Sequence, residues 1–304
     1  MHAVDSDILQ QRAPLKFHSG AYDFQIARTG DKINYSMSDG KNSLSQALDW
    51  AFGFGDVGQT YVYEKDGTYY ESRLSFFPSL QALDLTLGHN PPPPENLAAA
   101  LGRPMAAPEA RQCFGCHTTA SNIAGRLEPS HLIPGVSCEA CHGPGLRHAL
   151  AMREGQQEFA GQTIFNPARL EPQEYLDFCG ACHRTAADVA MADLKGRITV
   201  RFQPYRLEQS RCWGTDGDAR LTCRTCHDPH QPLVKDAASY DGRCLACHPS
   251  SAAAVSGSAR EDDHSPRACP VEKSNCASCH MPKVDLPGAH AHFTDHRIRI
   301  VKPE

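Results

Sequence analysis

Alternating apolar and polar side chains run through residues 1–90 and predict strands. Such alternation is typical of strands with one buried face, and the turn signals Thr29-Gly30-Asp31 and Asp66-Gly67 separate neighbouring segments. The first cysteine of the chain is Cys113. We therefore predict a small antiparallel β unit, with strands at 22–28, 33–37, 60–64 and 68–76.

Two short patterns lie between these predicted strands. Ser43 and Gln46 have the spacing of a capping box, so we expect a short helix from there through Trp50. Residues 53–58 spell Gly-x-Gly-x-x-Gly, but a strand follows them instead of the helix that a nucleotide site requires. We interpret these glycines as a flexible turn that enters the third strand.

The composition changes after residue 90, and the apolar pattern becomes helical. Residues 91–104 are rich in proline and alanine, and four consecutive prolines make a stiff, extended connector. Short helices are predicted at Leu146–Arg153, Pro172–Phe178 and Thr185–Leu194, with long loops between them.

Six Cys-x-x-Cys-His pentapeptides occur in this second part of the chain. The pattern is the attachment signature of a c-type haem: two thiols add to the vinyl groups, and the adjacent histidine binds the iron. We expect six covalently attached haems c. The predicted attachment cysteines are Cys113, Cys116, Cys138, Cys141, Cys179, Cys182, Cys223, Cys226, Cys244, Cys247, Cys276 and Cys279, and the predicted proximal ligands are His117, His142, His183, His227, His248 and His280.

Zinc is the main alternative for paired cysteines. Four-thiolate zinc sites also use Cys-x-x-Cys pairs, but they do not need a histidine directly after every second cysteine, and here every pair has one. A thiol–disulfide redox motif normally occurs once, near a strand-helix-strand pattern, so that interpretation is weaker still.

Haem packing explains how this composition folds. Hydrophobic residues make up 40% of the chain and aromatic residues 8%, and six haems after Cys113 leave too few residues for each to have its own fold. The haems are therefore expected to share walls. The predicted fold class is α+β with much irregular structure: a haem-free β-rich unit over 1–90, a Pro/Ala-rich connector over 91–110, and a mainly α, haem-packed cytochrome domain over 111–304.

The charge and the apolar runs exclude several partners. The formal net charge is −5, and haem propionates add negative charge, so nucleic acid is not an expected partner. No run of eighteen apolar residues predicts a transmembrane segment, and no secretory signal is visible at the start. Because c-type haem is attached outside the cytoplasm, we expect a periplasmic or extracellular protein with a targeting segment upstream of Met1.

Histidines outside the motifs are candidates for the second axial position of each iron. There are ten of them and only six methionines, so bis-histidine ligation should dominate. His230 follows the proximal His227 by three residues, a reach of at most about 11 Å, so it can serve only a neighbouring haem. The same argument applies with less force to His148. Close motif starts, 113 with 138 and 223 with 244, predict two haem pairs.

These motifs carry a family resemblance. The run from His131 through PGVSCEACHGPGLRH, CGACHR at 179–184, CRTCHDPH at 223–230, and CASCHMPK at 276–283 with the following FTDHRI resemble the multihaem cytochromes that include cytochrome c554-type proteins and cytochromes fused to tetratricopeptide repeats. The C-terminal part is also similar to pentahaem nitrite reductase. The resemblance implies extracytoplasmic electron transfer and closely stacked haem pairs. It also implies distal-ligand roles for His131, His148, His230 and His296, and for His18, His89, His264 and His290.

The sequence departs from these families in three respects. It has no Cys-x-x-Cys-Lys, which marks the catalytic haem of the nitrite reductases, and no tetratricopeptide pattern. Relatives often have a further haem motif upstream of the β unit, and this sequence has none there. We therefore expect that the natural start lies further upstream.

The predicted function is therefore electron transfer by a hexahaem cytochrome that has no catalytic residues of its own. Redox proteins, or other subunits of an electron-transfer complex, are the expected partners. One alternative is a multihaem oxidoreductase that acts on a small nitrogen or sulfur oxyanion at an open iron position. Another is a subunit of an extracellular cytochrome filament.

Two cysteines, Cys212 and Cys269, lie outside the motifs. An oxidising compartment would allow a disulfide between them, which would stabilise the fold by roughly 4 kcal/mol on the chain-entropy model. Two unrelated buried thiols are an equally good interpretation.

Overall fold

The computed structural model describes residues 1–89, 94–214, 218, 220–248, 269 and 271–301 of the chain. It divides into two units. Unit 1 comprises Met1–Phe165 and Pro287–Ala291, and unit 2 comprises Asn166–Leu286 and His292–Glu304. Helices, strands and irregular segments are mixed along the chain, and the predicted division at residues 91–110 stays a prediction.

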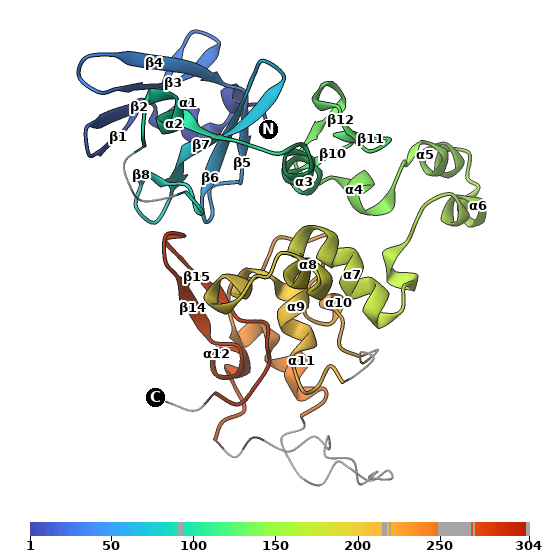
Figure 1. The fold of residues 1–304 in the computed structure, drawn as a ribbon. Helices are drawn as coiled ribbons and strands as arrows, with labels where there is room; N and C mark the ends of the chain where they lie inside the picture. Colours follow the sequence, from blue (N-terminus) through green and yellow to red (C-terminus); the bar gives the residue numbers. More distant parts are fainter. Residues whose placement is uncertain (90–93, 215–217, 219, 249–268, 270, 302–304) are drawn as a thin grey trace, which may run out of the picture. The chain divides into compact units, whose positions relative to one another are not determined.

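Two antiparallel sheets form the first part of unit 1, which we call the β region (residues 1–104; Figure 1). One sheet has the order β1-β2-β3-β4, and the other has the order β5-β6-β7-β8 with β9 paired to β7. The strands are β1 (Leu15–Ser19), β2 (Tyr22–Thr29), β3 (Lys32–Ser38), β4 (Ser43–Leu48), β5 (Trp50–Phe52), β6 (Gln59–Lys65), β7 (Thr68–Phe77), β8 (Ala82–Leu85) and β9 (Gly102–Pro104). Three short helices accompany them: η1 (Ala3–Asp5), α1 (Asp7–Arg12) and α2 (Leu97–Leu101).

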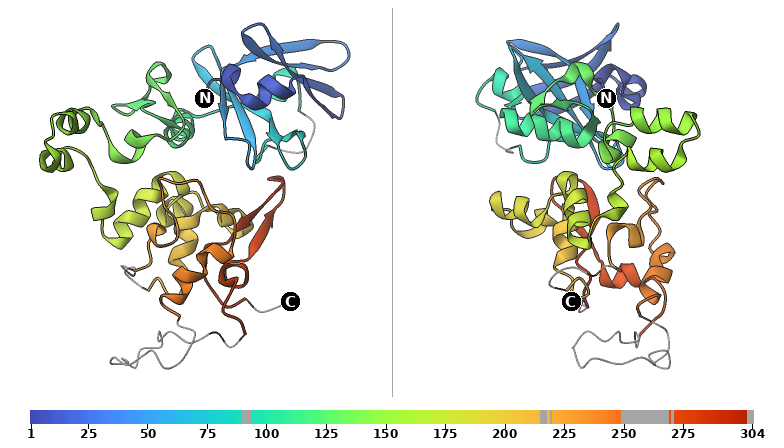
Figure 2. Two further views of the ribbon diagram at one scale, coloured as in Figure 1. Left: turned by 180° about the vertical axis from the view of Figure 1, so that it is seen from behind. Right: turned by 90° about the vertical axis from the view of Figure 1, so that its right-hand side faces the viewer.

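Side chains of both sheets form a single apolar cluster, and Figure 2 shows the sheets from two further sides. Phe24 and Tyr35 come from the first sheet, Tyr61 and Phe76 from the second, and all four are at most 2% exposed. Buried and less buried residues alternate along β2 and β3, so these strands turn one face inward. The four strands predicted from alternation are confirmed as β2, β3, β6 and β7.

The helix predicted from Ser43 through Trp50 is wrong. Residues 43–48 form β4, which pairs along its whole length with β3, and Trp50 begins β5. Hydrogen bonds to β3 and burial of Leu48 outweigh the local capping signal. The predicted turn at residues 53–58 is confirmed, because Gly53 has φ +100° and leads, without a helix, into β6.

The rest of unit 1 consists of short helices and two-residue strands. It comprises α3 (Ala107–His117), β10 (Thr118–Thr119), β11 (Asn122–Ile123), β12 (Arg126–Leu127), η2 (Pro129–His131), β13 (Ile133–Pro134), α4 (Cys138–His142), α5 (Leu146–Arg153) and α6 (Gln157–Gln162). The predicted helix Leu146–Arg153 is α5 and is confirmed.

Unit 2 is mainly helical. It comprises η3 (Pro167–Arg169), α7 (Pro172–His183), α8 (Ala186–Met191), η4 (Gly196–Arg201), α9 (Gln203–Glu208), α10 (Cys223–Cys226), η5 (Ala238–Tyr240), α11 (Asp241–Leu245), α12 (Cys276–His280) and β14 (Lys283–Leu286), and β15 (Ala291–Thr294) pairs with β14. The helices predicted at 172–178 and 185–194 are confirmed as α7 and α8, with α7 continuing through the third motif. Within the described ranges, no helix has the length and apolarity needed to cross a membrane.

Candidate haem sites

The first cysteine of every motif lies in a helix, from α3 at the first motif to α12 at the sixth. Residues three apart lie on the same face of a helical turn, so each pair of thiols can approach one porphyrin edge. The motif histidine ends the helix at the first, second, third and sixth motifs, whereas His227 and His248 follow α10 and α11. This local geometry suits covalent haem attachment where both cysteines lie in the helix, at every motif except the fifth, whose helix α11 ends before Cys247.

Capping residues explain why the chain folds into helices at these points. Pro172 opens α7, and a capping box between Glu171 and Glu174 satisfies its first N–H groups. At the sixth motif, the Asp241 carboxylate accepts the backbone N–H groups of Asn275 (2.7 Å) and Cys276 (2.8 Å). These bonds lower the pKa of Asp241. They also connect the helix of the fifth motif, α11, to the start of α12.

Five histidines share one hydrogen-bonding arrangement. Each donates from Nδ1 to a carbonyl oxygen, which can only accept, and in the neutral ring this arrangement leaves Nε2 available to a metal. The pairs are His142 with Phe165 O (2.8 Å), His148 with Ala160 O (3.0 Å), His183 with Gln203 Oε1 (3.2 Å), His280 with Arg299 O (2.9 Å) and His296 with Thr294 O (3.0 Å). Three of the five are predicted proximal ligands, and the other two, His148 and His296, are predicted distal ligands.

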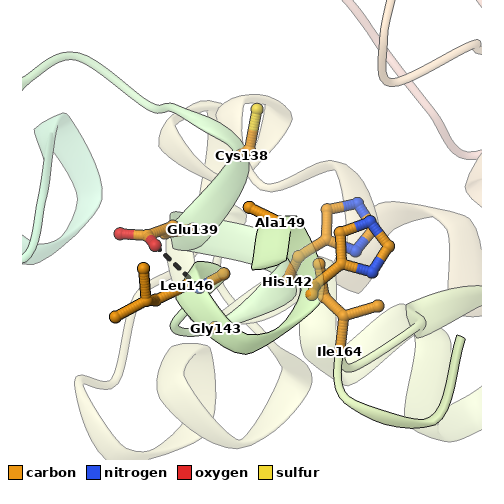
Figure 3. A pocket seen from close by; sticks show the side chains of 9 residues that line it. Cys138, Glu139, His142, Gly143, Leu146, Ala149 and Ile164 are labelled. Atoms are coloured by element: carbon orange, nitrogen blue, oxygen red, sulfur yellow. Dashed lines mark hydrogen bonds between the residues drawn. The ribbon is translucent and has the colours of Figure 1, made fainter. Parts of the chain in front are cut away.

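A cavity of about 420 Å³ adjoins the second motif (Figure 3). Cys138, His142 and His148 line it, together with apolar side chains that include Leu146 and Ile164. The turn between the motif and α5 is held because Glu139 Oε1 accepts the N–H of Gly145 at 2.7 Å. The structure thus brings a predicted proximal and a predicted distal histidine to one mainly apolar cavity. Whether His148 serves this haem or a neighbour stays a prediction.

The fourth motif has a second histidine beside it. The ring centres of His227 and His296 are 6.2 Å apart, with the ring planes inclined by 39°. Imidazole nitrogens bind metals at about 2 Å, so two rings on opposite sides of one iron have centres about 6 Å apart. Burial lowers the pKa of both histidines. Low pKa values keep the rings neutral, which is the form that binds a metal.

Motif cysteines contact one another in unit 2. The thiols of Cys179 and Cys223 share a hydrogen bond, which is the main reason that the pKa of Cys179 is raised. Cys244 and Cys276 are similarly bonded, and burial raises the pKa of Cys276 to about 12. The third motif therefore adjoins the fourth, and the fifth adjoins the sixth.

The first and second motifs are joined by backbone pairing. β10, directly after His117, pairs with β13, and Thr119 Oγ1 accepts the N–H of Ser137 at 2.9 Å, one residue before Cys138. The short spacing between residues 113 and 138 predicts that the haems of these two motifs form a close pair. The stacking of the haems themselves stays a prediction.

Aromatic side chains of β5 pack against the first motif. Phe52 of β5 lies with its ring centre 5.3 Å from that of His117, and Trp50 and Phe52 both contact Phe114 edge-on. The indole N–H of Trp50 is buried without a hydrogen-bond partner. The β region thus contributes side chains beside the candidate haem site at the first motif, a contribution that the sequence did not predict because the pattern around Trp50 predicted a helix.

Three predicted distal ligands in unit 1 are paired with carboxylates. His89 Nε2 lies 3.1 Å from Glu71 and His290 Nε2 lies 2.8 Å from Asp84, while exposed His18 bonds Asp23 through Nδ1 at 2.8 Å. In His89 and His290 the nitrogen that a haem would use is occupied by a carboxylate. Their predicted ligand role stays untested.

The remaining candidates are at the surface or outside the described residues. His131 ends η2 and is exposed, and the side chain of His230 is 73% exposed near Asp228. His264 lies outside the described residues. Cys212 and Cys269 form no disulfide in the structure. The structure thus contains two separate thiols, and both are exposed, whereas the alternative to a disulfide was a pair of buried thiols.

Comparisons with known proteins give two family matches and one related protein. Residues 95–143, with the first and second motifs, match the family of cytochrome c554 and c-prime, and residues 215–286, with the last three motifs, match the cytochrome c3 family. A cytochrome c-554 of Nitrosomonas europaea is 31% identical over 81 residues, which are 24% of this chain and 34% of that protein. The chain thus spans about a third of this relative's length. No solved structure matches.

Proposed function

We propose that the chain is a multihaem c-type cytochrome, as its motifs and these matches support, and that it carries electrons along six closely packed, covalently attached haems with mainly bis-histidine ligation. Bound haem iron supplies one-electron chemistry by alternating between its ferric and ferrous forms. The chain's residues attach, orient and shield the six groups.

The observation that most supports this proposal is the shared arrangement of the five histidines. Proximal and distal candidates alike have Nδ1 fixed to a carbonyl oxygen, so both kinds of ring are held in the tautomer that presents Nε2. An enzyme would instead need one iron without a second protein ligand and nearby acid and base groups.

Distal ligands can be proposed for some of the six irons. His296 is proposed as the partner of His227, because their ring spacing fits one iron between them. His148 is proposed as a ligand at or beside the second motif. His131, His230 and His264 are proposed from the resemblance alone. His18, His89 and His290 are retained as weaker proposals because of their carboxylate partners.

Location and partners follow from the chemistry. Covalent haem attachment supports a periplasmic or extracellular protein. Electrons would enter at one exposed haem edge and leave at another, so redox proteins, or other subunits of an electron-transfer complex, are the proposed partners.

Carbon monoxide binding tests the electron-carrier proposal. The reduced, fully haem-loaded protein should not bind carbon monoxide rapidly and should not turn over nitrite or hydroxylamine, because every iron has two protein ligands. The variant His148→Ala should gain rapid binding at about one haem per chain. His292→Ala is the matched control and should gain none, because His292 is 69% exposed beside Asp285 and is not among the proposed ligands. Rapid stoichiometric binding by the unaltered protein would favour an enzyme.

A further inference from the structure

Asp295 is the centre of the contacts that hold residues 294–299 in unit 2. Its side chain is 2% exposed, and its carboxylate accepts four hydrogen bonds. Arg206 donates two of them from α9, at 2.7 and 2.6 Å, and Arg299 donates one at 2.7 Å. The fourth comes from the backbone N–H of Arg297 at 3.1 Å. Two guanidinium groups thus neutralise one buried carboxylate.

Backbone contacts fix the same segment from other sides. Ser210, which is 3% exposed, accepts the N–H of Ile298 at 2.8 Å and donates to the carbonyl oxygen of His296 at 3.4 Å. The N–H of Asp295 donates to Pro282 O at 3.0 Å. The backbone on both sides of His296 is therefore tied to α9 and its C-terminal extension and to the residues after the sixth motif.

This segment serves two motifs. His296 lies beside His227 of the fourth motif, with Nδ1 bonded to Thr294 O. At the other end, Arg299 O accepts the Nδ1–H of His280, and the N–H of Arg299 donates to His280 O at 3.2 Å. One short stretch of chain thus presents a predicted distal ligand to one motif and orients the proximal histidine of another.

We propose that Asp295 is a positioning residue for haem ligation: its carboxylate holds residues 294–299 so that His296 reaches the iron of the fourth motif. The proposal rests on the proposed bis-histidine function. A ligand on an irregular segment has no regular secondary structure to fix its direction, and a metal ligand must be held within about 0.5 Å of its productive position. The Arg206–Asp295 pair supplies that rigidity from α9.

A purely structural role is the alternative. Buried ion pairs are weak evidence for a stabilising role, and removing one partner leaves an unpaired charge that destabilises a fold in general. The two roles differ in what they do to one particular iron. A positioning role predicts that loss of the carboxylate changes the haem of the fourth motif, and no other, from low-spin to high-spin. The protein should otherwise remain folded and fully loaded with haem.

The test compares four variants of the haem-loaded full chain by electron paramagnetic resonance of the oxidised protein. His296→Ala provides the reference signal, about one high-spin haem per chain. Asp295→Asn keeps the side-chain shape and removes the charge, and should give the same high-spin signal at a substantial fraction of that intensity, with Asp295→Glu restoring part of the low-spin form. Asp193→Asn is the matched control, because Asp193 also pairs with a cation in unit 2 but is 79% exposed.

The outcomes separate the two proposals. A low-spin spectrum of Asp295→Asn, unchanged from that of the unaltered protein, would overturn the positioning role while leaving the electron-carrier proposal intact. A His296→Ala variant without a high-spin signal would overturn the ligand assignment and the positioning role together. If Asp295→Asn does not mature, Ser210→Ala, which removes only the serine contacts, should show a smaller high-spin fraction. Failure of both variants to retain their haems would mean that the cluster serves folding alone.

Discussion

The β region and the segment that follows the first motif bury their apolar side chains to very different extents. In the β region, large side chains such as Tyr61 and Phe76 are at most 1% exposed, and both sheets contribute to one cluster. In residues 121–165, by contrast, Leu146 is 69% exposed and Phe159 47%, although the segment is folded into helices and strand pairs. The first region completes a core from its own residues, whereas the second presents apolar residues around the second Cys-x-x-Cys-His motif.

This difference indicates what holds each region together. Two packed sheets give enough apolar burial for stability without a cofactor. Helices of five to eight residues, such as α4 and α5, are too short to be stable alone. Their exposed apolar side chains are therefore suited to cover porphyrin faces, and the haems are expected to supply the core that the polypeptide does not.

The largest expected effect is that of withholding haem. A chain made without haem attachment should keep the β region folded and lose the structure of residues 121–165. Proteases should then cut residues 121–165 on the order of a hundredfold faster than the β region, because cleavage follows the population of the open form. Limited proteolysis with mass spectrometry measures both rates. Equal resistance of the two regions would contradict the comparison.

Substitutions at matched apolar residues should sharpen the comparison further. Phe76→Ala removes a fully buried ring of the β region and should lower its unfolding free energy by about 3–5 kcal/mol, with unchanged haem absorption. Hydrogen exchange of the amides of β7 measures this loss.

Leu146→Ala is the counterpart in the haem-binding segment. Substitution of an exposed residue normally changes stability by less than about 0.5 kcal/mol. If a haem covers Leu146, the loss in the loaded protein should instead approach about 2 kcal/mol, in denaturant unfolding followed by haem absorption. A loss near zero in the loaded protein would mean that haem does not cover this side chain.

A smaller effect is expected from an ion-pair network at the end of the β region. Hydrogen bonds from Arg103 lower the pKa of Glu109, so the folded state holds this carboxylate in its charged form. The stabilisation is complete above the ordinary glutamate pKa and is lost as the pH falls through the lowered folded value. Because the pair is partly exposed, the change should be below about 1 kcal/mol. Denaturant midpoints at neutral and acid pH should differ less in Glu109→Gln than in the unaltered chain.

Local patterns in the sequence predicted the elements whose stability is local. The alternation in β2, β3, β6 and β7 and the helix signals of α5, α7 and α8 were read correctly, because each element carries its own periodicity or caps. β4 was misread because its pairing with β3, which decides its structure, is not visible in its own residues.

The haem sites could be predicted only where chemistry is encoded in adjacent residues. Each Cys-x-x-Cys-His motif contains the spacing that attachment requires, so the proposed attachment residues follow from the sequence alone. The proposed partnership of His296 with His227 depends on tertiary packing across many residues, and so does the contact of Arg206 with Asp295. No spacing rule reveals these contacts.

The spin state of the fully oxidised, haem-loaded protein tests the central claim most directly. Quantitative electron paramagnetic resonance, combined with a count of covalent haem adducts by denatured mass spectrometry, gives the number of low-spin irons per chain. Two histidines on every iron predict six adducts and six low-spin irons, with no stoichiometric high-spin signal. Fewer than six adducts, or one full high-spin iron per chain, would contradict the account.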